Sequence, residues 1–164
     1  MHYSKSDFMR VCDLLDQNNV FPELEVQSKQ ELISILVDTL NHHVSEELTE
    51  RAREAVMNRE DIMSTGVGRG LAIPHGKSTG LDRSYAAFAR LVTPIEYGAI
   101  DGEPVNMVFL LVGPEAQNSL HIKMLSRVSR LLNNQSFREK LENANNAGEI
   151  LEAFRNEEEQ FIKV

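Results

Sequence analysis

One histidine follows a short apolar run in the segment GLAIPHG, at residues 70–76. The run at 71–73 predicts a brief buried strand, and Pro74 and Gly76 predict that the chain leaves the sheet sharply at His75. Proline fixes its own φ, and glycine turns where a side chain would clash, so the imidazole is presented on stiff backbone. Such preorganisation suits transfer chemistry. A core or turn histidine satisfied by one hydrogen bond gives the same local pattern.

A wider stretch around this histidine closely resembles a known signature. Residues 59–76 read REDIMSTGVGRGLAIPHG and resemble the phosphohistidine signature of enzyme IIA in the fructose/mannitol class (type 2) of the bacterial phosphoenolpyruvate-dependent sugar phosphotransferase system. The blocks DGEPV at 101–105, VFLLV at 108–112 and SLHIKML at 119–125 resemble the family in the same order. The resemblance covers most of the chain, from about residue 28 onward. It implies that His75 is phosphorylated, that His121 is the second active-site histidine and that Arg59 is the active-site arginine.

The chemistry of two of these side chains agrees with that implication. Phosphoryl transfer needs a nucleophile, an in-line approach and donors around three charged oxygens. The imidazole of His75 is a good nucleophile when one ring nitrogen is free and the other donates to a fixed acceptor. The guanidinium of Arg59 is always charged and grips a phosphate with two parallel donors, whereas lysine offers a point charge. We therefore expect Arg59 to clamp the phosphoryl group.

His121 stands at the start of a segment whose apolar spacing predicts a helix, with Ser119 as its expected cap. The first turn of a helix favours anions and disfavours a protonated ring, so His121 is expected to act as a neutral donor to phosphate. Without the paired motif, a surface histidine beside a cap would be the simpler interpretation.

The glycines at 66, 68 and 70 and the hydroxyls of Ser64 and Thr65 offer further donors to a phosphate. They do not form a dinucleotide fingerprint or a nucleotide P-loop, because Leu71 stands where each motif needs glycine. No cofactor is expected. No metal site is expected either, since the histidines and the lone Cys12 have none of the spacings of zinc ligands. Cys12 is interpreted as a packing residue.

Length and composition limit the remaining classes. A chain of 164 residues fits one domain, and the resemblance implies that this is a single enzyme IIA type-2 domain over 1–164. No apolar run approaches the ~20 residues of a membrane span, and a single cysteine suits a reducing compartment, so a cytoplasmic protein is expected, without direct membrane insertion. The formal net charge of −8 argues against nucleic-acid binding.

The order of the predicted elements favours an α/β fold. Helices are expected from the capping pattern at Ser28, from a cap at Ser45 to near Arg59, and from Ser119. Two further helices are expected over 135–142 and over 147–156, the last opened by Asn146 with Glu149 three residues on. Strands are expected near 71–74, 85–92 and 105–112, with Thr93-Pro94 and Gly113-Pro114 as stops. This alternation predicts an α/β/α sandwich with a central mixed β-sheet flanked by helices on both faces, which the family resemblance also implies.

Two functions stay open at this point. In the first, the chain is a phosphocarrier: His75 accepts a phosphoryl group from the phosphorylated histidine-containing carrier protein and passes it to an enzyme IIB-type acceptor in sugar uptake. In the second, implied by the resemblance to the nitrogen-regulatory branch of the family, it is a stand-alone module whose phosphorylation state controls binding to a regulatory target protein. Both make the chain a phosphotransferase component with a phosphohistidine intermediate.

Overall fold

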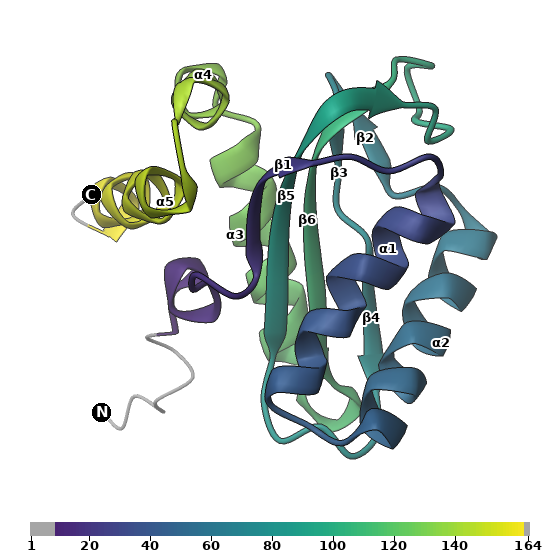
Figure 1. Cartoon of the computed structure of the whole chain (residues 1–164). Helices are drawn as coiled ribbons and strands as arrows, with labels where there is room; N and C mark the ends of the chain where they lie inside the picture. The colour runs from purple at the N-terminus through teal and green to yellow at the C-terminus, as the bar shows by residue number, and fades with distance from the viewer. Residues whose placement is uncertain (1–8, 163–164) are drawn as a thin grey trace.

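A mixed β-sheet lies between two layers of helices in the computed structural model, which describes residues 9–162 (Figure 1). The strands are β1 (Val20–Leu24), β2 (Gly66–Gly68), β3 (Leu71–Ala72), β4 (His75–Ser78), β5 (Tyr85–Ile95) and β6 (Val105–Pro114). The α-helices are α1 (Lys29–Asp38), α2 (Glu46–Ile62), α3 (Asn118–Leu132), α4 (Gln135–Asn143) and α5 (Ala147–Ile162). Short 3-10 helices are η2 (Val11–Leu14), η3 (Thr39–His42) and η4 (Glu115–Gln117).

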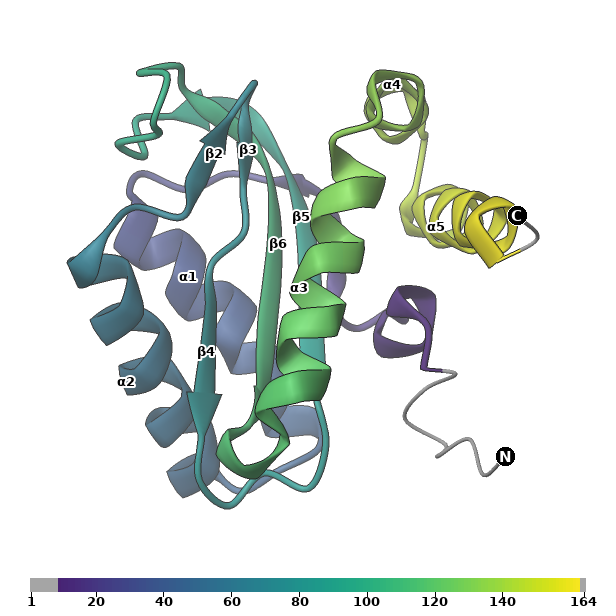
Figure 2. The same ribbon diagram turned by 180° about the vertical axis from the view of Figure 1, so that it is seen from behind.

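The strand order is β1-β5-β6-β3-β2, and β4 also pairs with β6. The sheet is mixed, because β1 runs parallel to β5 and both β3 and β4 run parallel to β6, whereas β5 and β6 are antiparallel. Helices α1 and α2 cover one face, and α3, followed by α4 and α5, lies on the other (Figures 1 and 2). The predicted α/β/α sandwich is confirmed.

Two apolar cores hold the layers together, one on each face of the sheet. Side chains alternate along a strand, so successive residues of β6 enter different cores: Val112 packs toward α1 and α2, and Leu111 packs toward α3. The second core centres on Phe154 of α5, whose ring contacts the rings of Phe88, Phe109 and Phe137. The long β5 and β6 thus form the centre of the sheet, and the shorter strands β1, β3 and β4 pair with them.

The predicted helix starts are largely confirmed. The hydroxyl of Ser28 accepts from the Glu31 amide, Ser45 does the same for Leu48, and the side chain of Asn146 accepts from the amide of Glu149. The prediction that Ser119 caps α3 is wrong, because the N-cap position is Gln117 and η4 leads directly into the helix.

Several strand boundaries differ from the predictions. The expected stop at Thr93-Pro94 is wrong: β5 continues to Ile95 because the register with β6 shifts between Arg90 and Ile95, and a proline fits in such an irregularity. β6 likewise runs to Pro114 instead of stopping at residue 112. The expected strand over 71–74 is shorter, because β3 covers only Leu71–Ala72, and a separate strand, β4, begins at His75. Strands β1 and β2 were not predicted.

The sharp exit expected at His75 is also wrong. The carbonyl of Pro74 accepts from the amide of Leu111, so the chain stays beside β6 and His75 opens a new strand that pairs with it. Over residues 9–162 no helix combines the length and apolar character that crossing a bilayer requires.

Candidate functional site

Arg59, His75 and His121, the three predicted site residues, line one pocket of about 470 Å³. They come from α2, β4 and the first turn of α3, and α2 and α3 lie on either side of β4 at this edge of the sheet (Figure 2). The rings of His75 and His121 lie with their centroids 5.9 Å apart and their planes tilted by 50°. Residues that are distant in the sequence therefore meet as the resemblance implied.

The ring of His75 is held by its own strand. Its Nδ1 lies 2.8 Å from the carbonyl oxygen of Ile73, an oxygen that can only accept, so Nδ1 carries the proton and Nε2 keeps its lone pair. Partial burial lowers the pKa of the imidazole below its ordinary value, and the charge of Arg59 lowers it further against the opposing effect of the Ile73 bond. A neutral ring with a defined free nitrogen is the form that acts as a nucleophile.

His121 is buried between α3 and β6, with 3% of its surface exposed. Burial lowers its pKa to about 4, and the nearby His75 and Lys77 contribute to that shift. The ring is therefore neutral at neutral pH and cannot serve as a cation. Its position in the first turn of α3 agrees with this, because the positive end of the helix dipole opposes protonation.

Arg59 lies in the last turn of α2, and one of its nitrogens, Nη1, donates to the carbonyl of Met63 at 2.8 Å. This bond closes the end of the helix and fixes one arm of the guanidinium. The planar group has five N–H donors, so the arm that does not contact Met63 is available to an anion in the pocket. The sequence placed Arg59 at the end of the helix, and the structure extends α2 to Ile62.

The next residue, Glu60, anchors the end of α2 in the core. Its carboxylate is 7% exposed and accepts from the ammonium of Lys29 at 2.9 Å and from the amide of Thr65 at 3.0 Å. The hydroxyls of Thr65 and Tyr97 also donate to it. Burial alone would raise the pKa of Glu60, but the bonds from Thr65 and Lys29 outweigh burial and hold it below its ordinary value. This buried network was not predicted.

The same network removes Thr65 from the expected set of phosphate donors. Its hydroxyl is occupied by Glu60 and Tyr97, and the hydroxyl of Ser64 accepts from the amide of Gly66. The glycines of this segment form β2 and the turn into β3, where the amide of Arg69 donates to Asp101. None of residues 64–70 lines the pocket. The proposed amide cradle is therefore not formed there.

Gly76 has a different role from the predicted turn. A Cβ at this position would lie 3.0 Å from the backbone nitrogen of Val56 and 3.1 Å from the carbonyl carbon of Ala55. The missing side chain lets β4 lie directly against α2. This close approach brings the strand of His75 and the helix of Arg59 together.

The pocket also contains polar residues that sequence reasoning missed: Lys77, Glu115 and Asn118. The ammonium of Lys77 donates to the side-chain oxygen of Asn118 at 2.6 Å and joins β4 to the start of α3. The period of two in a strand could have identified Lys77, because residues 75 and 77 face the same side.

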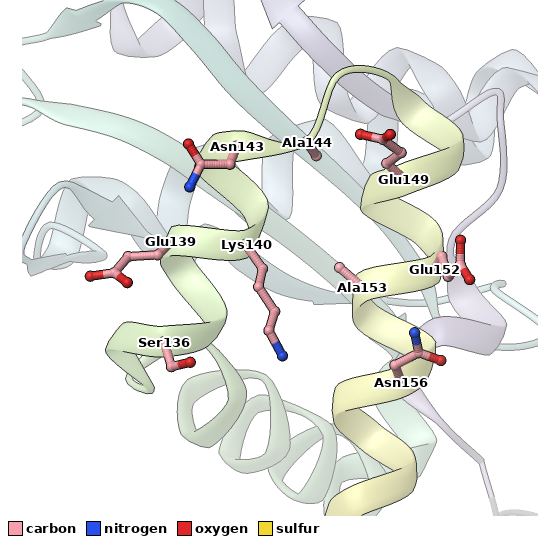
Figure 3. Close-up of a pocket in the computed structure, with 9 residues that line it drawn as sticks. All are labelled: Ser136, Glu139, Lys140, Asn143, Ala144, Glu149, Glu152, Ala153 and Asn156. Atoms are coloured by element: carbon pink, nitrogen blue, oxygen red, sulfur yellow. The ribbon is translucent and has the colours of Figure 1, made fainter.

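A larger pocket, of about 620 Å³, lies elsewhere, between α4 and α5 (Figure 3). Its walls are mostly exposed polar side chains, including Glu139, Lys140, Glu149 and Glu152. None of the predicted site residues belongs to it. Pocket size alone would therefore have pointed away from the three predicted residues.

Within residues 9–162 no group of three or more His, Cys, Asp or Glu side chains could hold a metal ion. The thiol of Cys12 packs against the α3 side of the core, and burial together with Glu158 raises its pKa to about 12. Such a thiol is protonated and a poor nucleophile at neutral pH.

Comparison with protein families gives a match over residues 13–157 to the family described as phosphoenolpyruvate-dependent sugar phosphotransferase system, EIIA 2. Among curated proteins, the chain is 39% identical to a nitrogen regulatory protein of Bradyrhizobium diazoefficiens, covering 87% of this chain and 92% of that protein. It is 31% identical to a fructose-specific EIIABC component of Bacillus subtilis, covering 88% of this chain but 23% of that longer protein.

Solved structures share the fold. The nitrogen regulatory protein IIA-Ntr of Neisseria meningitidis superposes with a TM-score of 0.80 at 30% identity, covering 88% of this chain and 98% of that one. Enzyme IIA-Mtl of Escherichia coli, in its complex with phosphorylated enzyme IIB-Mtl, superposes with a TM-score of 0.72 at 20% identity, covering 87% and 97%. At that identity the second likeness concerns the fold alone.

Proposed function

The chain belongs to the EIIA type 2 family of the phosphoenolpyruvate-dependent sugar phosphotransferase system, and we propose that it carries a phosphoryl group on His75. The observation that supports this most is the placement of His75, whose Nε2 lone pair is left free by the bond between Nδ1 and Ile73 while Arg59 and His121 line the same pocket. EIIA domains are phosphotransferase components, and the proposal assigns that chemistry to these three side chains.

The proposed transfer takes place in two matched steps. Nε2 of His75 attacks the phosphorus of a phosphohistidine on the histidine-containing carrier protein; a P–N bond to His75 forms as the P–N bond to the donor breaks, and the donor imidazole keeps the electron pair. The guanidinium of Arg59 and an N–H of His121 stabilise the charge on the phosphoryl oxygens. In the second step an acceptor nucleophile takes the phosphoryl group and His75 is the leaving group.

The proposed partners follow from this chemistry. The donor is a histidine-containing phosphocarrier protein, and the acceptor is an enzyme IIB-type protein, the kind of partner bound by the structurally similar IIA-Mtl. The proposal places the chain in the cytoplasm as one EIIA domain over residues 1–164, without a cofactor.

A labelling experiment tests the assignment of His75. The purified chain is incubated with phosphoenolpyruvate, enzyme I and the carrier protein, and intact-mass spectrometry measures the gain of one acid-labile phosphoryl group. His75→Ala should abolish the gain, and His42→Ala should retain it, since His42 is exposed at the end of η3. Labelling of the His75→Ala protein at the wild-type rate would disprove the assignment.

A second function is favoured by one specific observation. The chain is more similar to the nitrogen regulatory protein of Bradyrhizobium diazoefficiens, at 39% identity, than to the fructose-specific EIIABC component of Bacillus subtilis, at 31%. In this alternative, phosphorylation of His75 switches the binding of a regulatory target protein. Incubating the phosphorylated chain with a purified IIB-type protein separates the two: transfer to IIB supports a transport carrier, and stable phosphorylation with no transfer supports the regulatory role.

A further inference from the structure

A buried serine lies beside the ring of His121. Ser84 directly precedes β5, and the pairing of Tyr85 with Val112 places it opposite Gly113 of β6. Ala86 and Leu111, the next pair, both pack in the core on the α3 side. Because strand positions two apart share a face, Ser84 and Gly113 also face α3.

Gly113 leaves a notch in this face, and the imidazole of His121 fills it. A Cβ at Gly113 would lie 3.1 Å from Nδ1 of His121 and 3.3 Å from Oγ of Ser84. The two polar atoms thus border the same small space. Lys77, which pairs with Gly113 from β4, lies on the other side of the notch from Ser84.

Both atoms lack a hydrogen bond to any of residues 9–162. Ser84 is 2% exposed and His121 is 3% exposed, yet neither Oγ of Ser84 nor Nδ1 of His121 has a partner there. Leaving a buried polar atom unpaired destabilises a fold, so a hydrogen bond between these two atoms would satisfy both at once. A serine hydroxyl rotates about its Cα–Cβ bond and can donate or accept, so a change of rotamer brings it toward the ring.

We propose that Ser84 is a positioning residue for His121, whose Nδ1 accepts a hydrogen bond from the Ser84 hydroxyl. A neutral imidazole has one proton, which must then reside on Nε2. With Nδ1 turned to the notch, Nε2 is the nitrogen left for the pocket, so the tautomer chosen by Ser84 makes His121 a donor to a phosphoryl oxygen. The inference rests on the proposed function, since it explains how His121 performs that role. The low pKa of His121 keeps the ring neutral, which is the form in which a tautomer is defined.

The tautomer is measured directly on the unphosphorylated protein. Long-range ¹H–¹⁵N spectra of histidine-labelled protein, with the His121→Ala spectrum assigning the ring, should show His121 protonated at Nε2 and unprotonated at Nδ1. Ser84→Ala should convert this signal to a mixture of tautomers. Ser78→Ala is the matched control, because Ser78 is a buried serine of β4, one residue from Lys77 and therefore on the opposite face; it should leave His121 unchanged.

Transfer from the carrier protein supplies the second readout. Ser84→Ala should slow it roughly 10-fold, the scale seen when a histidine loses the partner that fixes its tautomer at metal centres. Ser84→Thr, which keeps the hydroxyl, should restore the tautomer. The inference is overturned if the His121 ring of the wild-type protein is protonated at Nδ1. It is also overturned if Ser84→Ala changes neither the tautomer of His121 nor the rate of transfer. Wild-type protein that is not phosphorylated at His75 overturns the proposed function instead, because the tautomer measurement involves no phosphoryl group.

Discussion

Replacing Glu60 by glutamine tests whether the buried network really fixes the end of α2. The change keeps the size and shape of the side chain and removes its charge. Lys29, Thr65 and Tyr97 all donate to the carboxylate, so the amide group of glutamine would have to point its own donors at one of them. At least one buried donor is then left without an acceptor.

The size of the loss follows from these contacts. Hydrogen bonds to a charged group contribute about 1.5–3 kcal/mol, against about 0.5–1.5 kcal/mol between neutral groups. The bonds from Lys29, at 2.9 Å, and from the amide of Thr65, at 3.0 Å, both have normal hydrogen-bond length, so the loss of charge at these two contacts amounts to about 2–3 kcal/mol of unfolding free energy at neutral pH. Glu54→Gln, an exposed change on the same helix, should stay within about 0.5 kcal/mol.

The effect of Glu60→Gln must also depend on pH. The pKa of Glu60 is lowered in the folded chain, so its carboxylate stabilises the fold fully above its pKa in the unfolded chain. That stabilisation is lost as the pH falls through the folded-state pKa. Wild type and Glu60→Gln should therefore differ most at neutral pH and converge in acid.

Urea unfolding followed by circular dichroism, from pH 7 to the most acidic pH at which both proteins stay folded, measures this difference. A gap of constant size across that range would show that the charge of Glu60 contributes nothing to stability. A difference near zero at pH 7 would show that removing the charge of Glu60 costs no stability, so the network does not hold the end of α2 in place.

Three further changes address the pocket. Gly76→Ala should destabilise the fold by about 1–3 kcal/mol and slow phosphoryl transfer, because its Cβ would push β4 away from the backbone of Val56; equal stability by urea unfolding would contradict this. His121→Ala should slow transfer in both directions without abolishing phospho-His75, which rapid-quench labelling measures, and unchanged rates would remove its role. Arg59→Lys should slow transfer by losing the two-pronged grip, with little change in stability; wild-type kinetics in the same assay would argue against clamping.

The sequence was sufficient for features whose causes are local. The caps at Ser28, Ser45 and Asn146 each bond an amide three residues away, so a short pattern contains all the participants. The meeting of His75 with His121 was reached through the resemblance to a family, since nothing in either segment alone specifies the other. The structure brings the centroids of the two rings to within 5.9 Å of each other, and the substitutions above test the roles proposed for them.

Features that depend on pairing between distant segments were missed. β1 contains Pro22 and is specified mainly by the β5 edge beside it, and the glycine-rich segment forms β2 because β3 folds back onto it. In the sequence, Glu60 resembles the other acidic residues of an exposed helix. Its partners Lys29 and Tyr97 belong to distant segments, so the buried network cannot be recognised from the helix alone. The notch at Gly113 depends on the register between β5 and β6, and the alternation of apolar residues along a strand does not predict which residues of two strands pair.

The ring nitrogen of His75 that keeps its lone pair is selected by the main chain rather than by a neighbouring side chain. The acceptor for Nδ1 is the carbonyl of Ile73, a group that every amino acid at position 73 would also possess. Sequence drift at that position can alter packing and leave the choice of nitrogen untouched. Substitutions around the pocket can therefore change which partner proteins fit it, while the atom proposed to carry the phosphoryl group remains Nε2 of His75.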